Sequence, residues 1–224
     1  MTRLYIVRHC EAAGNKSRVF HGSFNSEITE NGQKQLEQLK ERFKDIKYDV
    51  IYSSDLNRAV KTAEAVNSHL KLNISLTKDI REIFGGKWEN IPFVKIKELY
   101  PEEYNLWEKN DESFKMPEGE SYCDFFERIV LGFEKILKDN KGKTIVAATH
   151  GTVIKMYLSY ILGYGLKNSS NVPWCDNTGV SCIDFDDDLN GKVVFMNDNS
   201  HLSDETKTII HQEWWKKSQK EGKV

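Results

Sequence analysis

A histidine and a cysteine stand side by side at positions 9 and 10, after the apolar run LYIV and directly after Arg8. Either side chain can attack phosphorus, because imidazole and thiolate are both nucleophiles. The two alternatives make different demands on the residues around them. Those demands indicate which kind of phosphate chemistry this stretch can support.

A cysteine nucleophile requires the pattern C-x5-R, in which backbone N–H groups and one arginine surround a phosphate. Counted from Cys10, the arginine should be residue 16, which is Lys16, and Arg18 lies two positions too far. Glu11 would also add a carboxylate to the anion loop. The spacing therefore favours His9 over Cys10.

Further cationic and donor side chains follow apolar runs elsewhere in the chain. Arg8 and His9 follow RLYIV, Arg58 comes about one helical turn after DVIYSS, and His150 ends the run TIVAATH. The carboxyl ends of parallel strands meet at one edge of a sheet, where ligands bind. Arginine forks match phosphate oxygens, and imidazole serves as nucleophile or donor. Together the four groups favour a phosphate site over four separate structural roles.

The elements that must position these residues alternate between strand and helix. Fully apolar runs such as TIVAAT are typical of buried parallel strands. Thr29 and Ser121 are expected to cap two of the helices. The alternation predicts an α/β domain with a mostly parallel sheet. Strands are expected at 3–7, 49–54, 73–78, 143–150, 180–186 and 192–197, and helices over 29–43, 55–70, 93–99, 102–109, 121–137 and 153–162.

Composition indicates an ordinary globular protein. The 224 residues are 39% hydrophobic and 29% charged, with a net charge of -2. A net charge of this sign does not indicate binding to nucleic acid or to an anionic membrane. No segment reaches the ~20 apolar residues of a membrane span. The N-terminal apolar run is too short for a signal peptide. Four cysteines without C-x-x-C spacing indicate reduced thiols in the cytoplasm and no zinc site.

Five blocks of the sequence resemble the histidine phosphatase (phosphoglycerate mutase-like) superfamily in their order and spacing. The blocks are LYIVRHCEAAGN, IYSSDLNRAVKTAEAV, REIFGGKWEN, PEGES and IVAATHGTVIK, and the resemblance runs from about Leu4 to Leu202. It implies a three-layer α/β/α sandwich and a phosphohistidine mechanism without metal or cofactor. The family usually has glycine where this chain has Cys10, which is a departure from the pattern.

The resemblance also implies roles for individual residues. His9 matches the nucleophile, and Glu82 in REIFGG matches the proton donor. Arg8, Arg58 and His150 match the phosphate pocket. The substrate-binding residues expected beside it are Asn15, His21, Gly22 and Gly151.

We therefore expect a single domain over 1–224, with 83–120 as a lid segment and 203–224 as a helical tail that docks on the domain. The expected function is a phosphatase of small phosphorylated metabolites. A phosphoglycerate mutase and a non-catalytic phospho-ligand-binding domain remain alternatives. Ile83-Phe84-Gly85 after Glu82 is closer to the phosphatase branch than the His-Tyr-Gly of the mutases. The sequence does not decide between a monomer and a homodimer, and it does not identify the substrate.

Overall fold

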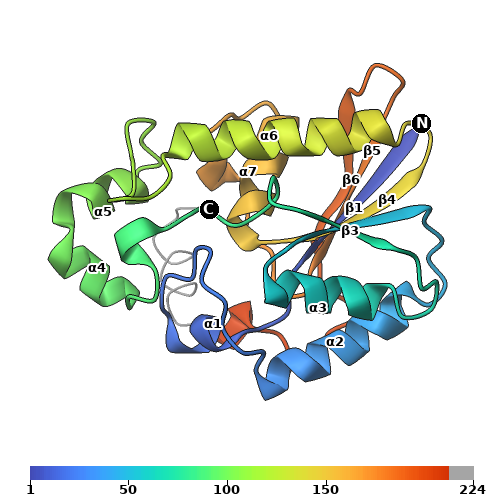
Figure 1. Cartoon of the computed structure of the whole chain (residues 1–224), viewed down its shortest axis with the longest axis horizontal. Coiled ribbons are helices and arrows are strands. Elements are labelled where there is room, and N and C mark those ends of the chain that lie inside the picture. The colour runs from blue at the N-terminus through green and yellow to red at the C-terminus, as the bar shows by residue number, and fades with distance from the viewer. Residues whose placement is uncertain (212–224) are drawn as a thin grey trace.

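The computed structural model describes residues 1–211, which form one six-stranded sheet flanked by helices (Figure 1). The strands are β1 Thr2–Arg8, β2 Val50–Ser54, β3 Ile74–Thr77, β4 Thr144–Thr149, β5 Val180–Phe185 and β6 Gly191–Asp198. Their order in the sheet is β3-β2-β4-β1-β5-β6. β3, β2, β4 and β1 pair in parallel, whereas β5 pairs antiparallel with both β1 and β6. The prediction of an α/β fold with a mostly parallel sheet is confirmed.

Helices connect the strands along the chain. They are α1 Ala13–Ser17, α2 Glu30–Phe43, α3 Asn57–Val66, α4 Phe93–Leu99, α5 Pro101–Glu108, α6 Tyr122–Asp139 and α7 Gly151–Ile161. Both predicted helix caps are present, because the hydroxyl of Thr29 accepts from the N–H of Gly32 and that of Ser121 accepts from the N–H of Asp124. Each cap satisfies one backbone donor that the first helical turn leaves without a partner.

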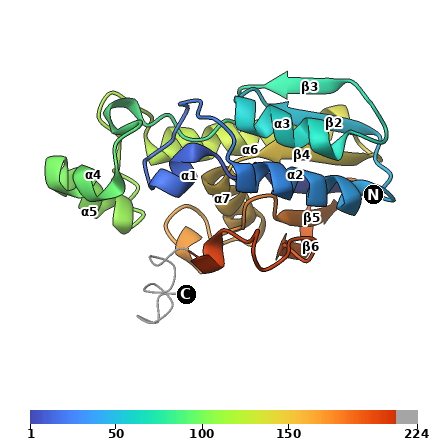
Figure 2. The ribbon, with the colours of Figure 1, turned by 90° about the horizontal axis from the view of Figure 1, so that it is seen from below.

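The sheet has a separate apolar core on each face, which makes the fold three-layered. On one face, Val7, Val146 and Ile51 of the strands pack with Leu39 and Phe43 of α2. The other face carries a larger core under α6 and α7, which includes Leu4, Ile6, Phe125, Phe133 and Tyr157. Figure 2 shows α2 and α3 on one side of the sheet and α6 and α7 on the other. These two faces hold the ends of β1 and β4 in fixed positions.

The helix predicted over 55–70 ends earlier than expected. α3 stops at Val66, and the side chain of Asn67 then bonds both the carbonyl (2.7 Å) and the N–H (2.9 Å) of Leu72. The hydroxyl of Tyr48 donates to the same Asn67 oxygen. Lys71 adopts a left-handed backbone with φ of 53°. The side-chain bonds of Asn67 replace the helical ones, so Leu70 lies outside the helix.

Residues 83–120 lie beyond the sheet and are built around aromatic rings (Figure 1). Trp88 is fully buried, and it packs against the rings of Phe20, Tyr100, Trp107 and Phe114. This ring cluster joins α4 and α5 to the loop after β1. These rings are continuous with the larger core under α6 and α7, so the segment is packed onto the domain.

The described part of the C-terminal segment is not an α-helix. A short 3-10 helix spans Ile209–His211, with Ile209 buried and Ile210 exposed. The carbonyl of Thr206 accepts from Gln35 (2.8 Å), which ties this segment to α2. The remainder of the expected tail, including Trp214 and Trp215, lies outside the described residues. Within residues 1–211, no helix has the length and apolar character needed to cross a membrane.

Candidate active site

The carboxyl ends of β1, β2 and β4 bring the predicted residues together. Arg8 pairs in register with Thr149, so His9 and His150 leave neighbouring strands at the same level. Their ring centroids are 5.2 Å apart. Arg58 comes from the first turn of α3, directly after β2. The strand-edge rule therefore located these four groups correctly.

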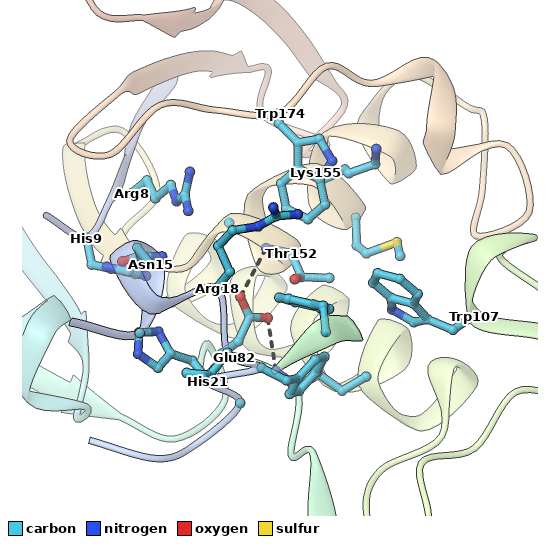
Figure 3. Close-up of a pocket in the computed structure, with 18 of the residues that line it drawn as sticks. Arg8, His9, Asn15, Arg18, His21, Glu82, Trp107, Thr152, Lys155 and Trp174 are labelled. Atoms are coloured by element: carbon cyan, nitrogen blue, oxygen red, sulfur yellow. Dashed lines mark hydrogen bonds between the residues drawn. The ribbon is translucent and has the colours of Figure 1, made fainter. Parts of the chain in front are cut away.

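A cavity of about 490 Å³ opens beside these strand ends. Figure 3 shows His9 and Arg8 at one side of it and Trp107 at the other. His150 is fully buried beside His9, with the two ring centroids 5.2 Å apart, and it is not among the residues that line this cavity. The other eight predicted site residues all line it, namely Arg8, His9, Asn15, His21, Gly22, Arg58, Glu82 and Gly151.

The hydrogen bonding of His9 fixes its tautomer. Its Nδ1 lies 2.7 Å from the carbonyl oxygen of Cys10, and a carbonyl only accepts, so Nδ1 carries the proton. The lone pair is then on Nε2. Burial, together with the positive charges of Arg58 and Arg8, lowers the pKa of His9 well below 6.5. At neutral pH the ring is neutral and its Nε2 can act as a nucleophile.

Cys10 is not placed to act as a nucleophile in the cavity. Its side chain is fully buried and does not line the cavity, and its N–H donates to Thr62 Oγ1 at 3.0 Å. Burial raises the pKa of the thiol to about 11, so little thiolate forms at neutral pH. Cys10 is not among the residues with positive φ, so its backbone is open to any residue. The departure from glycine at this position therefore costs no backbone strain.

Two arginines reach the cavity with part of each guanidinium already bound to protein. Arg8 Nη1 donates to the carbonyl of Cys175. Arg58 donates through Nη1 to Phe24 O and through Nη2 to Gly22 O, both at 2.8 Å. The Nε groups of both arginines are buried and have no hydrogen-bond partner among residues 1–211. Buried donors without partners are costly, and an anion in the cavity would satisfy them.

His150 supplies a third donor of this kind. Its Nε2 lies 2.8 Å from Ser54 Oγ, while its Nδ1 is buried without a partner in the described part of the chain. Ser54 Oγ also accepts from the N–H of Leu56 at 3.4 Å. The serine proton is thus free to point at Nε2, which leaves the imidazole proton on Nδ1. Burial and the charge of Arg58 lower the pKa of His150 well below 6.5, so it donates as a neutral ring.

Glu82 is held by backbone N–H groups on two sides (Figure 3). One carboxyl oxygen accepts from its neighbour Ile83 (3.0 Å), and the other accepts from Thr152 in the first turn of α7 (3.1 Å). The preceding residue, Arg81, forms an ion pair with Asp55, with Nη2 2.6 Å from Oδ2. These contacts fix the carboxyl group at the cavity wall.

Arg128 of α6 holds the same loop from the opposite side. Its Nε and Nη2 form a bidentate pair with Glu120, both at 2.8 Å. Its Nη1 donates to the carbonyl of Arg81 at 3.1 Å. Glu120 in turn accepts from the N–H of Phe84. The loop that carries Glu82 is therefore anchored to both α6 and α7.

Close packing explains two of the glycines and the position of His21. A Cβ on Gly14 would lie 1.7 Å from His21 Nε2, so only glycine lets the imidazole reach this place. His21 Nε2 is also 2.8 Å from Ser26 Oγ. Gly22 has φ of +50°, and its carbonyl accepts from Arg58. Asn15 uses its Oδ1 to accept from Ala12 N–H, which leaves its amide donors for the cavity.

Several cavity residues were not predicted as site residues from the sequence. Thr152 and Lys155 lie on α7, where a lysine four residues after Gly151 is a signal that the helical spacing offered. Trp174 lies in a loop without any periodic pattern. The rest of the missed lining includes Arg18, Val19, Phe93, Glu108, Met156, Ser170 and Ile209.

Arginine and imidazole groups such as those at the cavity are donors suited to a phosphate. Among residues 1–211, no group of three or more His, Cys, Asp or Glu side chains is placed to hold a metal. All four cysteines are free, at positions 10, 123, 175 and 182.

Comparison with known proteins places the chain in a family. The model of the histidine phosphatase superfamily (branch 1) matches residues 4–199. Phosphoserine phosphatase 1 of Hydrogenobacter thermophilus is 27% identical over 204 residues, which cover 91% of this chain and 96% of that protein. The structure of YhfR from Bacillus stearothermophilus is 28% identical, with a TM-score of 0.86, and the match covers 91% of this chain and all of that one. Phosphoserine phosphatase of Entamoeba histolytica, solved as a histidine-to-alanine variant with phosphoserine, is 25% identical with a TM-score of 0.80, over 91% of this chain and all of that one. The family match spans most of the sequence, and the chain belongs to the histidine phosphatase superfamily, branch 1.

Proposed function

We propose that this protein is a phosphatase that hydrolyses small phosphate monoesters through a phosphohistidine at His9. The observation that carries the proposal is the set of three buried, unpartnered donors around a neutral imidazole, namely Arg8 Nε, Arg58 Nε and His150 Nδ1. A phosphoryl group bound there would satisfy all three. They would also stabilise the charge that develops on its equatorial oxygens.

In the first step, Nε2 of His9 attacks phosphorus and the bond from phosphorus to the ester oxygen breaks. The leaving oxygen takes a proton from Glu82, which enters this step protonated. In the second step, water attacks phosphorus and the P–N bond breaks. Glu82 takes the proton that the water loses, and free phosphate leaves with His9 restored. The cations that this scheme uses are arginines, so it requires no metal.

The first substrate to test is phosphoserine, because relatives of this chain carry the name phosphoserine phosphatase. The free cysteines fit a reducing compartment such as the cytoplasm. We favour hydrolysis over mutase transfer because Ile83-Phe84-Gly85 follows Glu82 and because the segment that contains α4 and α5 is short. On 3-phosphoglycerate we therefore expect release of free phosphate, with no activation by 2,3-bisphosphoglycerate.

The nucleophile is tested with His9→Ala and Cys10→Ser assayed on p-nitrophenyl phosphate. We expect His9→Ala to abolish turnover and Cys10→Ser to retain most of it. A trapped phosphoenzyme should be labile in acid and stable in alkali, as phosphohistidine is. Turnover lost in Cys10→Ser but kept in His9→Ala would reverse the assignment. No turnover of any phosphate monoester by the native chain would support the non-catalytic alternative.

A further inference from the structure

Among residues 1–211, six of the nine buried or half-buried cations have a carboxylate partner. Within residues 1–211, such partners exist for Arg3, Lys40, Arg42, Arg81, Arg128 and Lys207. The other three have no carboxylate partner among residues 1–211. They are Arg8, Arg58 and Lys155, and all three line the cavity. Arg8 and Arg58 are accounted for by the phosphoryl group. Lys155 is the one that the proposed reaction does not use.

Lys155 lies on α7, one helical turn beyond Gly151. Its Nζ is 4.9 Å from the centroid of the Trp174 ring, which gives a cation–π contact. No hydrogen bond or ion pair joins its ammonium group to another described residue. Burial lowers the pKa of Lys155 to about 8, which reflects the cost of a charge without a counter-ion. An ammonium with three donors and one aromatic partner can still bind an anion.

The position of Lys155 separates it from the reacting centre. Figure 3 shows Lys155 and Trp174 on the side of Arg8 that faces away from His9. An anion bound there is therefore a second group of the substrate and not the phosphoryl group itself. Arg18, exposed at the cavity rim, adds a further cation, and Glu108, also exposed there, offsets it. The charges of Lys155, Arg18 and Glu108 therefore sum to one positive charge, which a single carboxylate of the substrate would neutralise.

Resting on the phosphatase function, we propose that Lys155, backed by Trp174, binds a carboxylate of the substrate, so that the enzyme selects phosphate monoesters of small carboxylic acids. Lys155 is then a specificity-determining residue. It touches the part of the substrate that does not react, so its contribution is the same in the ground state and the transition state. Such uniform binding lowers KM and leaves kcat nearly unchanged.

The test uses substrate pairs that differ only in the carboxylate. Phosphoserine is compared with phosphoethanolamine, and 3-phosphoglycerate with glycerol phosphate. Lys155→Met keeps an unbranched side chain that is one atom shorter and removes the charge. We expect it to lower kcat/KM for the two carboxylated substrates by roughly 10- to 100-fold, the range for a hydrogen bond to a charged group. The effect should be in KM, with less than about 2-fold change for the two substrates that lack the carboxylate.

Two controls separate binding from folding. Lys61→Met removes an exposed lysine of α3. It should leave kcat/KM unchanged for both substrates of each pair. The Tm of Lys155→Met should stay equal to that of the native protein or rise, because a half-buried charge without a counter-ion is removed. Equal losses on both members of a pair, or no loss on either, would overturn the carboxylate site.

The proposal is also testable if the chain turns nothing over. In a His9→Ala background, calorimetry gives Kd for phosphoserine and phosphoethanolamine without hydrolysis. Adding Lys155→Met should raise the Kd for phosphoserine and leave the Kd for phosphoethanolamine unchanged. If it instead weakens only a bisphosphate, such as 2,3-bisphosphoglycerate relative to glycerol phosphate, while phosphoserine is unaffected, the site takes a second phosphate and our assignment is wrong. An inactive native chain would thus refute the phosphatase function without deciding the carboxylate site.

Discussion

Replacing Glu82 with glutamine removes the transferable proton and changes little else. The carboxyl group of Glu82 accepts one backbone N–H on each oxygen, from Ile83 and from Thr152. Glutamine keeps one acceptor oxygen, so one of these two bonds survives, and the other N–H then faces an amide NH2. A buried donor that loses its partner costs about 1–3 kcal/mol of stability, and the partial exposure of Glu82 reduces this penalty. Glu82→Gln should therefore fold.

The loss of activity depends on the leaving group. General acid catalysis contributes about 10²- to 10⁴-fold, which corresponds to roughly 3–5 kcal/mol of transition-state free energy. An alkyl phosphate such as phosphoserine releases a basic alkoxide and needs the whole contribution. p-Nitrophenolate leaves readily without a proton. The variant should therefore lose 10²- to 10⁴-fold in kcat on alkyl phosphates but only a small factor on p-nitrophenyl phosphate.

The assay measures kcat and kcat/KM for the native enzyme and Glu82→Gln over alkyl, phenyl and p-nitrophenyl phosphates. The rate of the variant should rise steeply with the acidity of the leaving alcohol, whereas the native rate should change much less. Thermal unfolding of both proteins controls for the lost backbone bond. Equal losses across the series would mean that Glu82 does not protonate the leaving oxygen, and the role assigned to it would be wrong.

Three other predictions concern metal, thiol reactivity and pH. Activity should survive dialysis against EDTA, and loss that Mg²⁺ or Zn²⁺ restores would refute the metal-free scheme. Iodoacetamide at about pH 8 should modify the exposed Cys123 and spare the buried Cys10, whose thiol pKa burial raises to about 11; peptide mass spectrometry reads both sites. The free energy of unfolding should fall as pH drops below about 6.5. The pKa values of His9 and His150 are held well below 6.5 in the folded state, so there the unfolded chain binds more protons. The slope is at most about 1.4 kcal/mol per pH unit for each histidine, and denaturant titrations that are flat from pH 7 to 5 would contradict it.

The sequence predicted the residues at the strand ends well, because their convergence is a geometric property of a parallel sheet. His9, Arg58 and His150 needed only the correct order of strands and helices. The burial of His150, which packs beside His9, depends on side-chain packing that the sequence does not show. The end of α3 depended on a contact between Asn67 and Leu72 that helical periodicity does not encode. The helical spacing after Gly151 places Lys155 near the site, but its lack of a carboxylate partner among residues 1–211 is a property of the packed structure.

The central position of β1 in the sheet has a consequence for synthesis of the chain. β1 is made before both of its partners, because it pairs with β4, whose residues follow about 140 positions later, and with β5 beyond that. At the ribosome's rate of 5–20 residues per second, roughly 7–30 s pass before β4 exists. During that time an apolar strand with two unpaired edges is exposed, and the cavity at the carboxyl ends of β1 and β4 cannot form. The nascent protein should therefore depend on chaperones that shield its N-terminal strand, and its activity should appear only after translation has passed His150.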